Sequence, residues 1–148
     1  MLYVPRTPYL PPGTLREVLA YPAATDKFAA AAYANALARL RLDRLVPMLD
    51  VVHRWDRELS EDEQQTLAFA RVVLHAPPWV LIDEVLDSLD EEARQDILDI
   101  FVSDLPQIGV IHIGRADGRN QLFSRILHLV KDPTLRRLAA PSRLALSA

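Results

Sequence analysis

The sequence predicts an α/β protein in which a helical first half is followed by a mostly parallel sheet with flanking helices. Amphipathic and alanine-rich segments fill much of residues 14–76, as in packed helices. Short apolar runs at 79–82 and 108–113 are then separated by a helical pattern. This β-α-β order is typical of a parallel sheet with right-handed crossovers.

Composition limits the class of protein. The chain has 148 residues, enough for one domain with a core, and no cysteine, which excludes disulfides and thiolate metal sites. A net charge of −3 argues against a nucleic-acid partner, because no basic field attracts phosphates. No apolar run approaches the roughly 20 residues that span a bilayer, and the first residues lack the pattern of a signal peptide.

Prolines separate the first elements. A strand end is expected at 1–4, and the proline-rich stretch after it enforces an extended or turning path to Gly13. Thr14 can cap a short helix at 15–20 that stops before Pro22.

A longer helix over about 27–42 is predicted from its alanines and the spacing of its apolar residues, with Thr25 or Asp26 as its cap. Another helical turn or two is expected at 43–50. The residues at 53–58 are then predicted to form a polar loop.

Ser60 is placed to cap the next helix. The helical spacing of Leu67, Ala70 and Leu74 extends this helix to about residue 74, and the Pro77–Pro78 pair ends it.

The second half alternates strands and a helix. The run at 79–82 is continuously apolar, as in a strand buried on both faces. Asp90 can cap the following helix, whose first turn carries acids that the helix dipole favours. A second buried strand is expected at 108–113 and a third at 125–130, before a loosely held tail at 132–148.

Two adjacent acids, Asp83 and Glu84, follow the strand at 79–82 directly. In open α/β sheets, ligands bind at the carboxyl ends of the strands, where Arg115 is also expected. One carboxylate there can hold a hydrated Mg²⁺, and a second can orient a water for attack on a phosphate. The alternative is a strand that ends in a solvated acidic turn.

Further motifs flank this acid pair. They are YVPRTPYLPPGTLREVLAYP at 3–22, LSEDEQQ at 59–65, WVLIDE at 79–84, DSLD at 87–90 and VIHIGR at 110–115. In this order and spacing the chain resembles the ATP-binding cassette of ABC transporters, with its Q-loop, signature, Walker B, D-loop and switch segments. The resemblance spans residues 3 to about 131. The segment PYLPPGTLREVLAYP, residues 8–22, most resembles that of fused permease–ATPase half-transporters. These are related to peroxisomal fatty-acyl and bacterial peptide or vitamin B12 transporters.

The resemblance implies a P-loop NTPase-like partial cassette that uses ATP and Mg²⁺ in the intact protein. Asp83 would hold Mg²⁺ through water, and Glu84 would polarise the attacking water. Ser60 and the helix N-terminus after it would bind the γ-phosphate of ATP on a second cassette. Asp90 would face that dimer interface, and Arg115 would sense the γ-phosphate.

The resemblance also implies an organisation and partners. The expected segments are a Q-loop-like start at 1–13, a helical subdomain at 14–76, the Walker B half of the core at 77–131 and the tail at 132–148. The expected partners are a second cassette, as a homodimer, and a transmembrane permease domain in the same polypeptide. Residues 6–22 and the helical subdomain would contact that domain at the cytoplasmic face of the inner or plasma membrane.

The sequence departs from the family at four points. No GxxxxGK[ST] occurs, so the lysine and backbone cradle for the β- and γ-phosphates are missing. We therefore expect a truncated cassette that is inactive alone and, because its sheet edges are open, prone to dimerise or only marginally stable. The other departures are at candidate nucleotide-binding positions: Arg6 replaces the Q-loop glutamine, Asp62 a signature glycine and Arg115 the switch histidine.

These substitutions have two interpretations. In the first, they are the lineage's own versions of the motifs, since the planar fork of Arg115 can still contact a phosphate. In the second, they mark a degenerate cassette. The first predicts the C-terminal portion of an ABC transporter ATP-binding domain that couples ATP hydrolysis to transport. The second predicts a non-catalytic interaction or regulatory module, in which reverting Arg6, Asp62 and Arg115 is needed for turnover.

Overall fold

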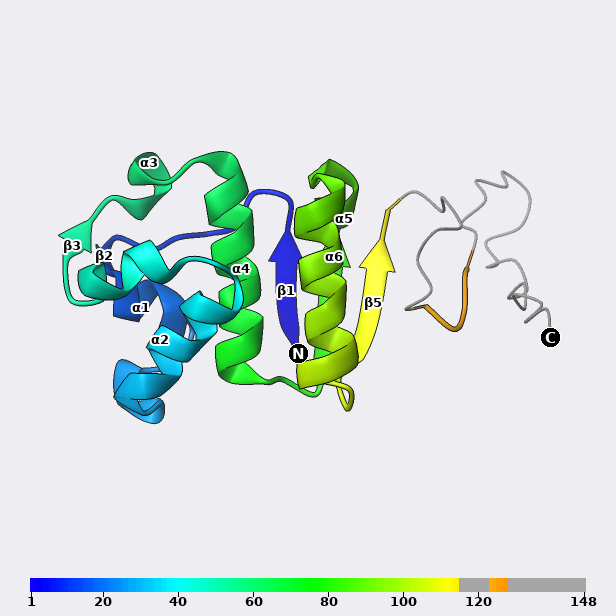
Figure 1. The fold of residues 1–148 in the computed structure, drawn as a ribbon, viewed down its shortest axis with the longest axis horizontal. Coiled ribbons are helices and arrows are strands. Elements are labelled where there is room, and N and C mark those ends of the chain that lie inside the picture. Colours follow the sequence, from blue (N-terminus) through cyan, green and yellow to red (C-terminus); the bar gives the residue numbers. More distant parts are fainter. Residues whose placement is uncertain (115–122, 128–148) are drawn as a thin grey trace, which may run out of the picture. The chain divides into compact units, whose positions relative to one another are not determined.

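The computed structural model describes residues 1–114 and 123–127, and the chain divides into two compact units, 1–114 and 115–148. Figure 1 labels elements of the first unit. The strands are β1 (Leu2–Pro5), β2 (Gly13–Thr14), β3 (Val52–His53), β4 (Trp79–Asp83) and β5 (Gly109–Ile113). The α-helices are α1 (Leu15–Ala20), α2 (Ala30–Arg39), α3 (Trp55–Glu58), α4 (Glu61–His75), α5 (Val85–Ser88) and α6 (Glu91–Asp99). The remaining helical segments are η1 (Thr25–Lys27), η2 (Asp43–Met48) and the π-helical turn η3 (Ile100–Asp104).

The main sheet has three parallel strands in the order β1-β4-β5. Its register places Pro5, Asp83 and Ile113 in line across the strands, so all three strands end at one edge. A separate antiparallel pair joins β2 to β3. The parallel strands and their flanking helices confirm the predicted α/β class.

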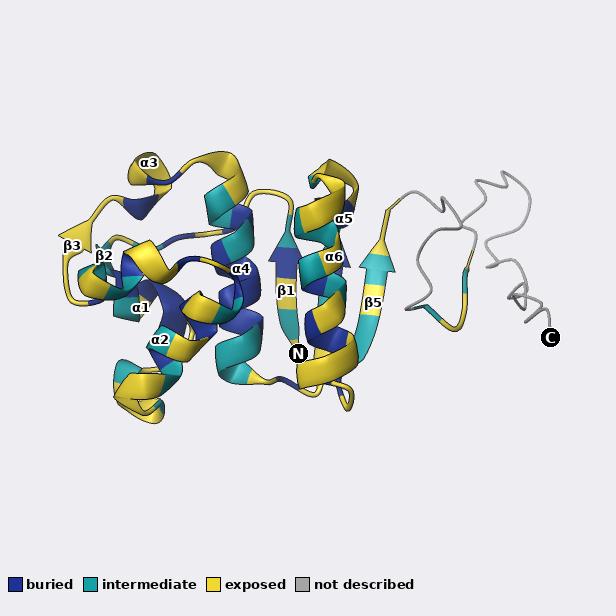
Figure 2. Cartoon of the chain, in the orientation of Figure 1, coloured by how far each residue is buried: buried dark blue, intermediate teal, exposed yellow. Residues whose placement is uncertain are grey.

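Helix α4 lies at the centre of the hydrophobic core. It packs against α1, α2 and β1, and its Leu67 and Phe69 are almost fully buried. Val4, Val80 and Ile82 complete the core from the sheet, and Figure 2 shows buried stretches along α4 and on β1. Burying side chains of this size contributes about 1.5–3 kcal/mol each, so one apolar stripe is enough to hold the helix on the sheet.

The opposite face of the sheet is open among the described residues. Trp79 is 51% exposed, and Ile111 and Ile113 are each 47% exposed, whereas Val80 and Ile82 are fully buried. Successive side chains of a strand point to opposite faces, so the described helices cover only one face. The prediction that the strand at 79–82 is buried on both faces is therefore wrong, and so is the prediction of a buried strand at 108–113, since Ile111 and Ile113 are exposed.

The second helix begins later than its alanines suggest. Helix α2 starts at Ala30 without a side-chain cap, and Thr25 and Asp26 lie in η1 instead of capping it. Phe28, which lies between η1 and α2, has extended backbone angles, φ −120° and ψ 142°, and these interrupt the helical path. The hydroxyl of Tyr33 donates to the carbonyl oxygen of Thr25 at 2.6 Å, so this turn packs back onto α2.

The predicted polar loop at 53–58 is wrong. His53 pairs with Gly13 in the small sheet, and Trp55 begins α3 with its side chain fully buried. The Trp55 indole N–H donates to the carbonyl oxygen of Gly13 at 2.9 Å. One aromatic side chain thus anchors a segment whose other residues are mostly polar and exposed.

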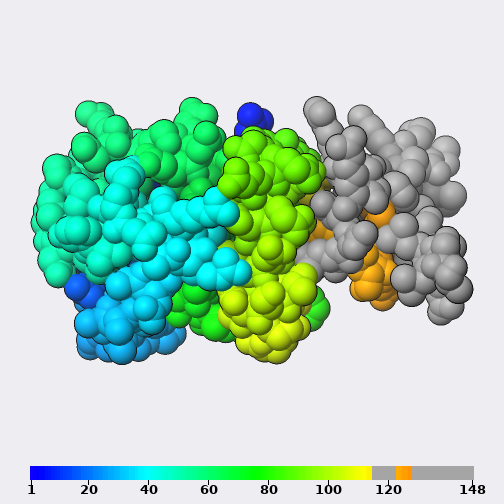
Figure 3. Space-filling model, in the orientation of Figure 1, coloured from blue at the N-terminus to red at the C-terminus, as the bar shows by residue number. Residues whose placement is uncertain are grey.

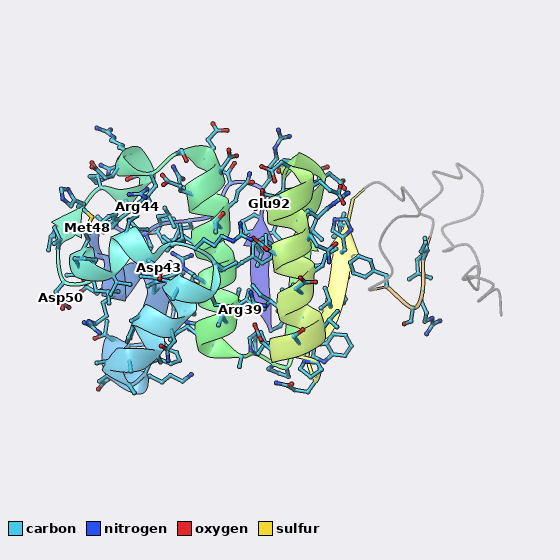
Figure 4. The ribbon with its side chains drawn as sticks, in the orientation of Figure 1. Arg39, Asp43, Arg44, Met48, Asp50 and Glu92 are labelled. Atoms are coloured by element: carbon cyan, nitrogen blue, oxygen red, sulfur yellow. The ribbon has the colours of Figure 1, made fainter. Side chains whose placement is uncertain are left out.

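Ion pairs join the end of α2 and the turn after it to α6 and η3. Arg39 contacts Asp104, and Arg41 contacts both Glu92 and Asp96; Figure 4 labels Arg39 and Glu92. In Figure 3 the cyan surface around η2 meets the yellow-green surface of α6. Such exposed pairs contribute at most about 1 kcal/mol each, so they orient these segments more than they stabilise them.

The predicted caps at Thr14 and Asp90 are confirmed: Thr14 forms a capping box with Glu17, and a carboxylate oxygen of Asp90 accepts the Ala93 N–H at 2.7 Å. Most of the predicted strand at 125–130, Arg115 and the tail at 132–148 lie outside the described residues. Within the described ranges, no helix is long and apolar enough to cross a membrane.

Candidate functional site

Asp83 is the last residue of β4, at the edge where the three parallel strands end. The Tyr3 hydroxyl donates to its Oδ2 at 2.8 Å. Tyr3 pairs with Leu81, two residues before Asp83, so the ring and the carboxylate lie on the same face of the sheet. This hydrogen bond, and secondarily burial, raises the pKa of Tyr3, because the protonated phenol is the form that can donate. Tyr3 therefore orients the carboxylate.

Glu84 follows with a left-handed backbone, φ 59°. Its N–H donates to the carbonyl oxygen of Ile113 at 2.8 Å, which ties the turn after β4 to the end of β5. A non-glycine residue in this conformation costs about 1–3 kcal/mol and persists only where its surroundings impose it, often at functional sites. The Glu84 side chain is exposed, so a strained backbone presents this carboxylate to solvent beside Asp83.

Gln65 connects this edge to α4, a role that the sequence did not assign. Its side chain is 6% exposed. Its amide nitrogen donates to the carbonyl oxygen of Arg6 at 3.1 Å, and its amide oxygen accepts from Ser88 Oγ at 3.3 Å. Two consecutive glutamines after an acidic first turn were the available signal, and the neighbouring Gln64 instead donates to the carbonyl oxygens of Asp56 and Leu59.

Gly114 allows close packing at the end of β5. A Cβ at this position would lie 2.6 Å from both Asp87 Oδ2 and His112 Nε2, so a larger residue would force these side chains to move. The switch-like segment and the DSLD segment therefore meet at this glycine, one residue before Arg115. Arg115 itself lies outside the described residues, so its predicted place at the edge stays a prediction.

Ser60 is the N-cap of α4, as predicted. Its Oγ accepts the Glu63 N–H at 3.3 Å, and the Glu63 carboxylate accepts the Ser60 N–H at 3.0 Å, a reciprocal capping box. Glu63 also contacts Arg44. Asp62 is exposed in the first turn, and its carbonyl oxygen accepts from Thr66. The cap leaves the Ser60 hydroxyl at an exposed helix N-terminus.

The structure places the start of α4, with Ser60 and Asp62, and the carboxyl end of β4, with Asp83 and Glu84, at one end of the first unit. In Figure 1 the start of α4 and the carboxyl ends of the strands are both at the top, and Gln65 links the Arg6 carbonyl to α5. The Arg6 side chain is exposed. Asp90 occupies its own helix N-terminus on α6, where it acts as a cap.

The residues present fit part of a Mg²⁺–nucleotide site. The described residues contain no cluster of three or more histidine or acidic side chains that could hold a metal alone. Mg²⁺ in nucleotide sites is instead held by one or two carboxylates together with phosphate oxygens, which suits Asp83. The chain has only four glycines and no GxxxxGK[ST], so it does not itself supply the usual phosphate cradle.

Comparisons with known proteins agree with the family resemblance found in the sequence. No family model matches the chain. An uncharacterized ABC transporter ATP-binding protein of Haemophilus influenzae is 35% identical over 128 residues, 86% of this chain and 22% of that protein. The inner membrane ABC transporter ATP-binding protein YddA of Escherichia coli is 30% identical, over 78% of this chain and 20% of its own length. The ABC transporter D family member 1 of Dictyostelium discoideum is 26% identical, over 89% of this chain and 19% of that protein.

The chain thus spans about a fifth of the length of these curated relatives. Among solved structures, an Atm1-family bacterial ABC exporter with ATP bound matches 96% of this chain and 25% of its own, with a TM-score of 0.77 and 26% identity. Sequence relatives and fold therefore agree with the motif order. The homologues of this chain are ATP-binding proteins of ABC transporters, and the chain is consistent with a C-terminal fragment of their cassette.

Proposed function

We propose that this chain is the C-terminal portion of an ABC transporter ATP-binding domain, and that the intact protein couples ATP hydrolysis to transport across a membrane. The observation that supports this most strongly is the acidic edge of the parallel sheet. There Asp83 is oriented by Tyr3, and Glu84 is presented by a left-handed turn tied to β5.

Each carboxylate has a separate task in this proposal. Asp83 holds the hydrated Mg²⁺, which when bound neutralises charge on the phosphate oxygens. Glu84 accepts a hydrogen bond from the attacking water and so directs it at the phosphate. Tyr3 keeps the Asp83 carboxylate fixed by occupying Oδ2. Arg115 senses the γ-phosphate from the switch segment.

The start of α4 serves the nucleotide of a second cassette. The N–H groups of its first turn and the helix dipole favour an anion. The exposed Ser60 hydroxyl donates to Glu63 Oε2 at 3.2 Å in this structure, and by rotating it can donate to a phosphate oxygen instead while its lone pair accepts the Glu63 N–H. Asp62 sets a negative charge against that anion, so affinity depends on how far its carboxylate turns away. Arg6, whose carbonyl oxygen is held by Gln65, and Asp90 complete the nucleotide and dimer contacts.

The partners follow from the same assignment. Two copies of the cassette form a homodimer around two ATP molecules, and a transmembrane domain in the same polypeptide contacts residues 6–22 and the helical subdomain. ATP favours the closed dimer and thereby shifts the membrane domain between its states. The complex acts at the cytoplasmic face of the membrane.

Titration calorimetry of Mg-ATP on the 148-residue chain tests the assignment of roles, with Glu84→Gln as control. We expect no saturable binding below about millimolar, because the chain carries no P-loop. Micromolar binding would place a nucleotide site elsewhere in these residues and overturn the roles given to Asp83 and Glu84.

A regulatory or interaction module is the second candidate, favoured by the three departures from the family motifs. It predicts that a cassette completed with a P-loop half stays inactive until Arg6→Gln, Asp62→Gly and Arg115→His are introduced together. Turnover without these reversions would exclude it.

A further inference from the structure

Gln65 is a buried polar residue in the first turns of α4, whose other buried residues are mostly apolar. Its side chain is 6% exposed, and among the described residues only Gln65 and Arg71 are polar or charged and buried to this degree. A buried amide is costly unless its nitrogen and its oxygen both find hydrogen-bond partners. The partners of this amide therefore show what it contributes.

Two segments at the acidic edge supply those partners. The Gln65 Nε2 donates to the carbonyl oxygen of Arg6 at 3.1 Å, and its Oε1 accepts from Ser88 Oγ at 3.3 Å. Arg6 directly follows β1, and Ser88 ends α5, the short helix that begins after Glu84. One side chain of α4 thus contacts the segments that leave β1 and β4, which are neighbouring strands of the main sheet.

The two contacts differ in strength. A carbonyl oxygen only accepts, so the amide nitrogen must face Arg6 and the amide oxygen must face Ser88. Ser88 has one hydroxyl proton, and its Oγ also lies 2.8 Å from the carbonyl oxygen of Val85 in the same turn. The contact of Ser88 with Gln65 is longer and therefore weaker. The Arg6 contact is fixed, whereas the Ser88 contact can be exchanged for one within α5.

The Ser88 contact restrains the turn that presents Glu84. Glu84 lies immediately before α5 and has a left-handed backbone. Its N–H donates to the carbonyl oxygen of Ile113 at 2.8 Å, which holds the turn at one end. Gln65 holds α5 at the other end, through Ser88. A strained residue persists only where its surroundings impose the conformation, so loss of either restraint should loosen the turn.

The same helix carries the proposed phosphate site of the second cassette. Gln65 lies about one and a half turns beyond Ser60 along α4. A helix moves as a rigid element, so a shift of its first turn on docking of a phosphate carries Gln65 with it.

We propose that Gln65 is a positioning residue for hydrolysis, which ties the start of α4 to the turn that presents Glu84. In this arrangement Glu84 is held in place while α4 is docked and is loosened when α4 shifts. The role in turnover rests on the proposed function, whereas the link between Gln65 and the Glu84 turn rests on the contacts alone.

Amide hydrogen exchange of the 148-residue chain, followed by nuclear magnetic resonance, tests this link without nucleotide. The readout is exchange at the Glu84 amide, because its hydrogen bond to Ile113 opens when the turn loosens. The reference is the Phe69 amide in the centre of α4, which reports the stability of the whole unit. Gln65→Met removes both hydrogen bonds at similar volume and should speed exchange at Glu84 about fivefold relative to Phe69.

The neighbouring glutamine provides a matched control. Gln64 also makes two hydrogen bonds, but they run to the carbonyl oxygens of Asp56 and Leu59, in the segment before α4. Gln64→Met should therefore leave the relative exchange at Glu84 within about twofold.

Ser88→Ala breaks the proposed contact from its other side and changes an exposed residue. It should speed the relative exchange at Glu84 about twofold or more. Added to Gln65→Met it should have no further effect, because both changes break the same contact.

A cassette completed with a P-loop half tests the role in turnover. Gln65→Met should lower kcat about tenfold and leave KM for ATP within about twofold, because the buried amide positions Glu84 and does not touch nucleotide. Gln64→Met should leave both constants within about twofold.

Three exchange results would overturn the proposal: equal acceleration by the Gln64 and Gln65 variants, equal acceleration at Glu84 and Phe69, or an additive effect of Ser88→Ala in the double variant. An unchanged kcat in Gln65→Met would overturn the role in turnover. A completed cassette without any turnover would contradict the proposed function, while the exchange at Glu84 still decides whether Gln65 holds the turn.

Discussion

Ser60 combines a structural role and a proposed functional role, and two substitutions separate them. In Ser60→Ala the Oγ that accepts the Glu63 N–H is lost, while the Glu63 carboxylate can still accept the residue-60 N–H. Loss of one N-cap side chain costs about 1 kcal/mol, with a range of about 0.5–2. The Oγ to nitrogen distance of 3.3 Å is long, which places the expected loss in the lower half of that range.

Ser60→Asp is the matched control because aspartate is as good an N-cap as serine. Thermal and urea unfolding of the 148-residue chain, followed by circular dichroism, should give Ser60→Ala a Tm about 2–4 °C lower and Ser60→Asp a Tm within about 2 °C. Equal loss in both variants, or no loss in Ser60→Ala, would refute the capping geometry.

The same pair tests the phosphate role in a cassette completed with a P-loop half. Aspartate keeps the cap of α4 but adds a second carboxylate where a γ-phosphate is proposed to dock. ATP turnover should therefore fall at least as far in Ser60→Asp as in Ser60→Ala, the reverse of the stability order. Full turnover in Ser60→Asp would remove Ser60 from the nucleotide site.

Three further predictions concern the fold and its titrating groups. Trp55→Phe should cost about 2–3 kcal/mol in urea unfolding, because it opens space and leaves the Gly13 carbonyl oxygen without its indole donor; a loss under about 1 kcal/mol would contradict the buried position. Tyr3→Phe should remove one of the raised tyrosine transitions from an ultraviolet titration, and Asp83→Asn should lower the pKa of that same transition; an unchanged profile in Asp83→Asn would show that the two side chains do not meet. Burial lowers the pKa of His75 below its ordinary 6.5, so the unfolded chain binds the proton more readily. Stability should therefore be complete above that pH and fall as pH drops through and below it, and a His75→Gln variant that loses stability equally over this window would rule His75 out.

The elements that the sequence predicted well are those with both a period and a stop signal. Helix α4 has Ser60 at its start, apolar residues at helical spacing and prolines after its end, so its bounds were predicted within a residue or so. Helix α1 was predicted correctly for the same reason, between Thr14 and Pro22. Where extended backbone at Phe28 interrupts a run of alanines, local propensity favoured a longer helix than the chain forms.

Features that depend on tertiary contacts were harder to predict from the sequence. The buried indole of Trp55 lies in a polar stretch that only its packing organises. The open face of β4 was missed because a run of apolar letters looks the same whether one face or both are covered. In the site, the order of motifs pointed to Asp83 and Glu84, but the left-handed turn of Glu84 and the bridging role of Gln65 depend on neighbours more than twenty residues away along the chain.

The most direct test of the account is ATP turnover by a cassette in which this chain is joined to the P-loop half of a related ABC protein. The account predicts Mg²⁺-dependent hydrolysis that Glu84→Gln lowers by about 100-fold or more, while Mg-ATP binding by calorimetry persists. Turnover that is unchanged in Glu84→Gln would contradict the central claim that this carboxylate directs the attacking water.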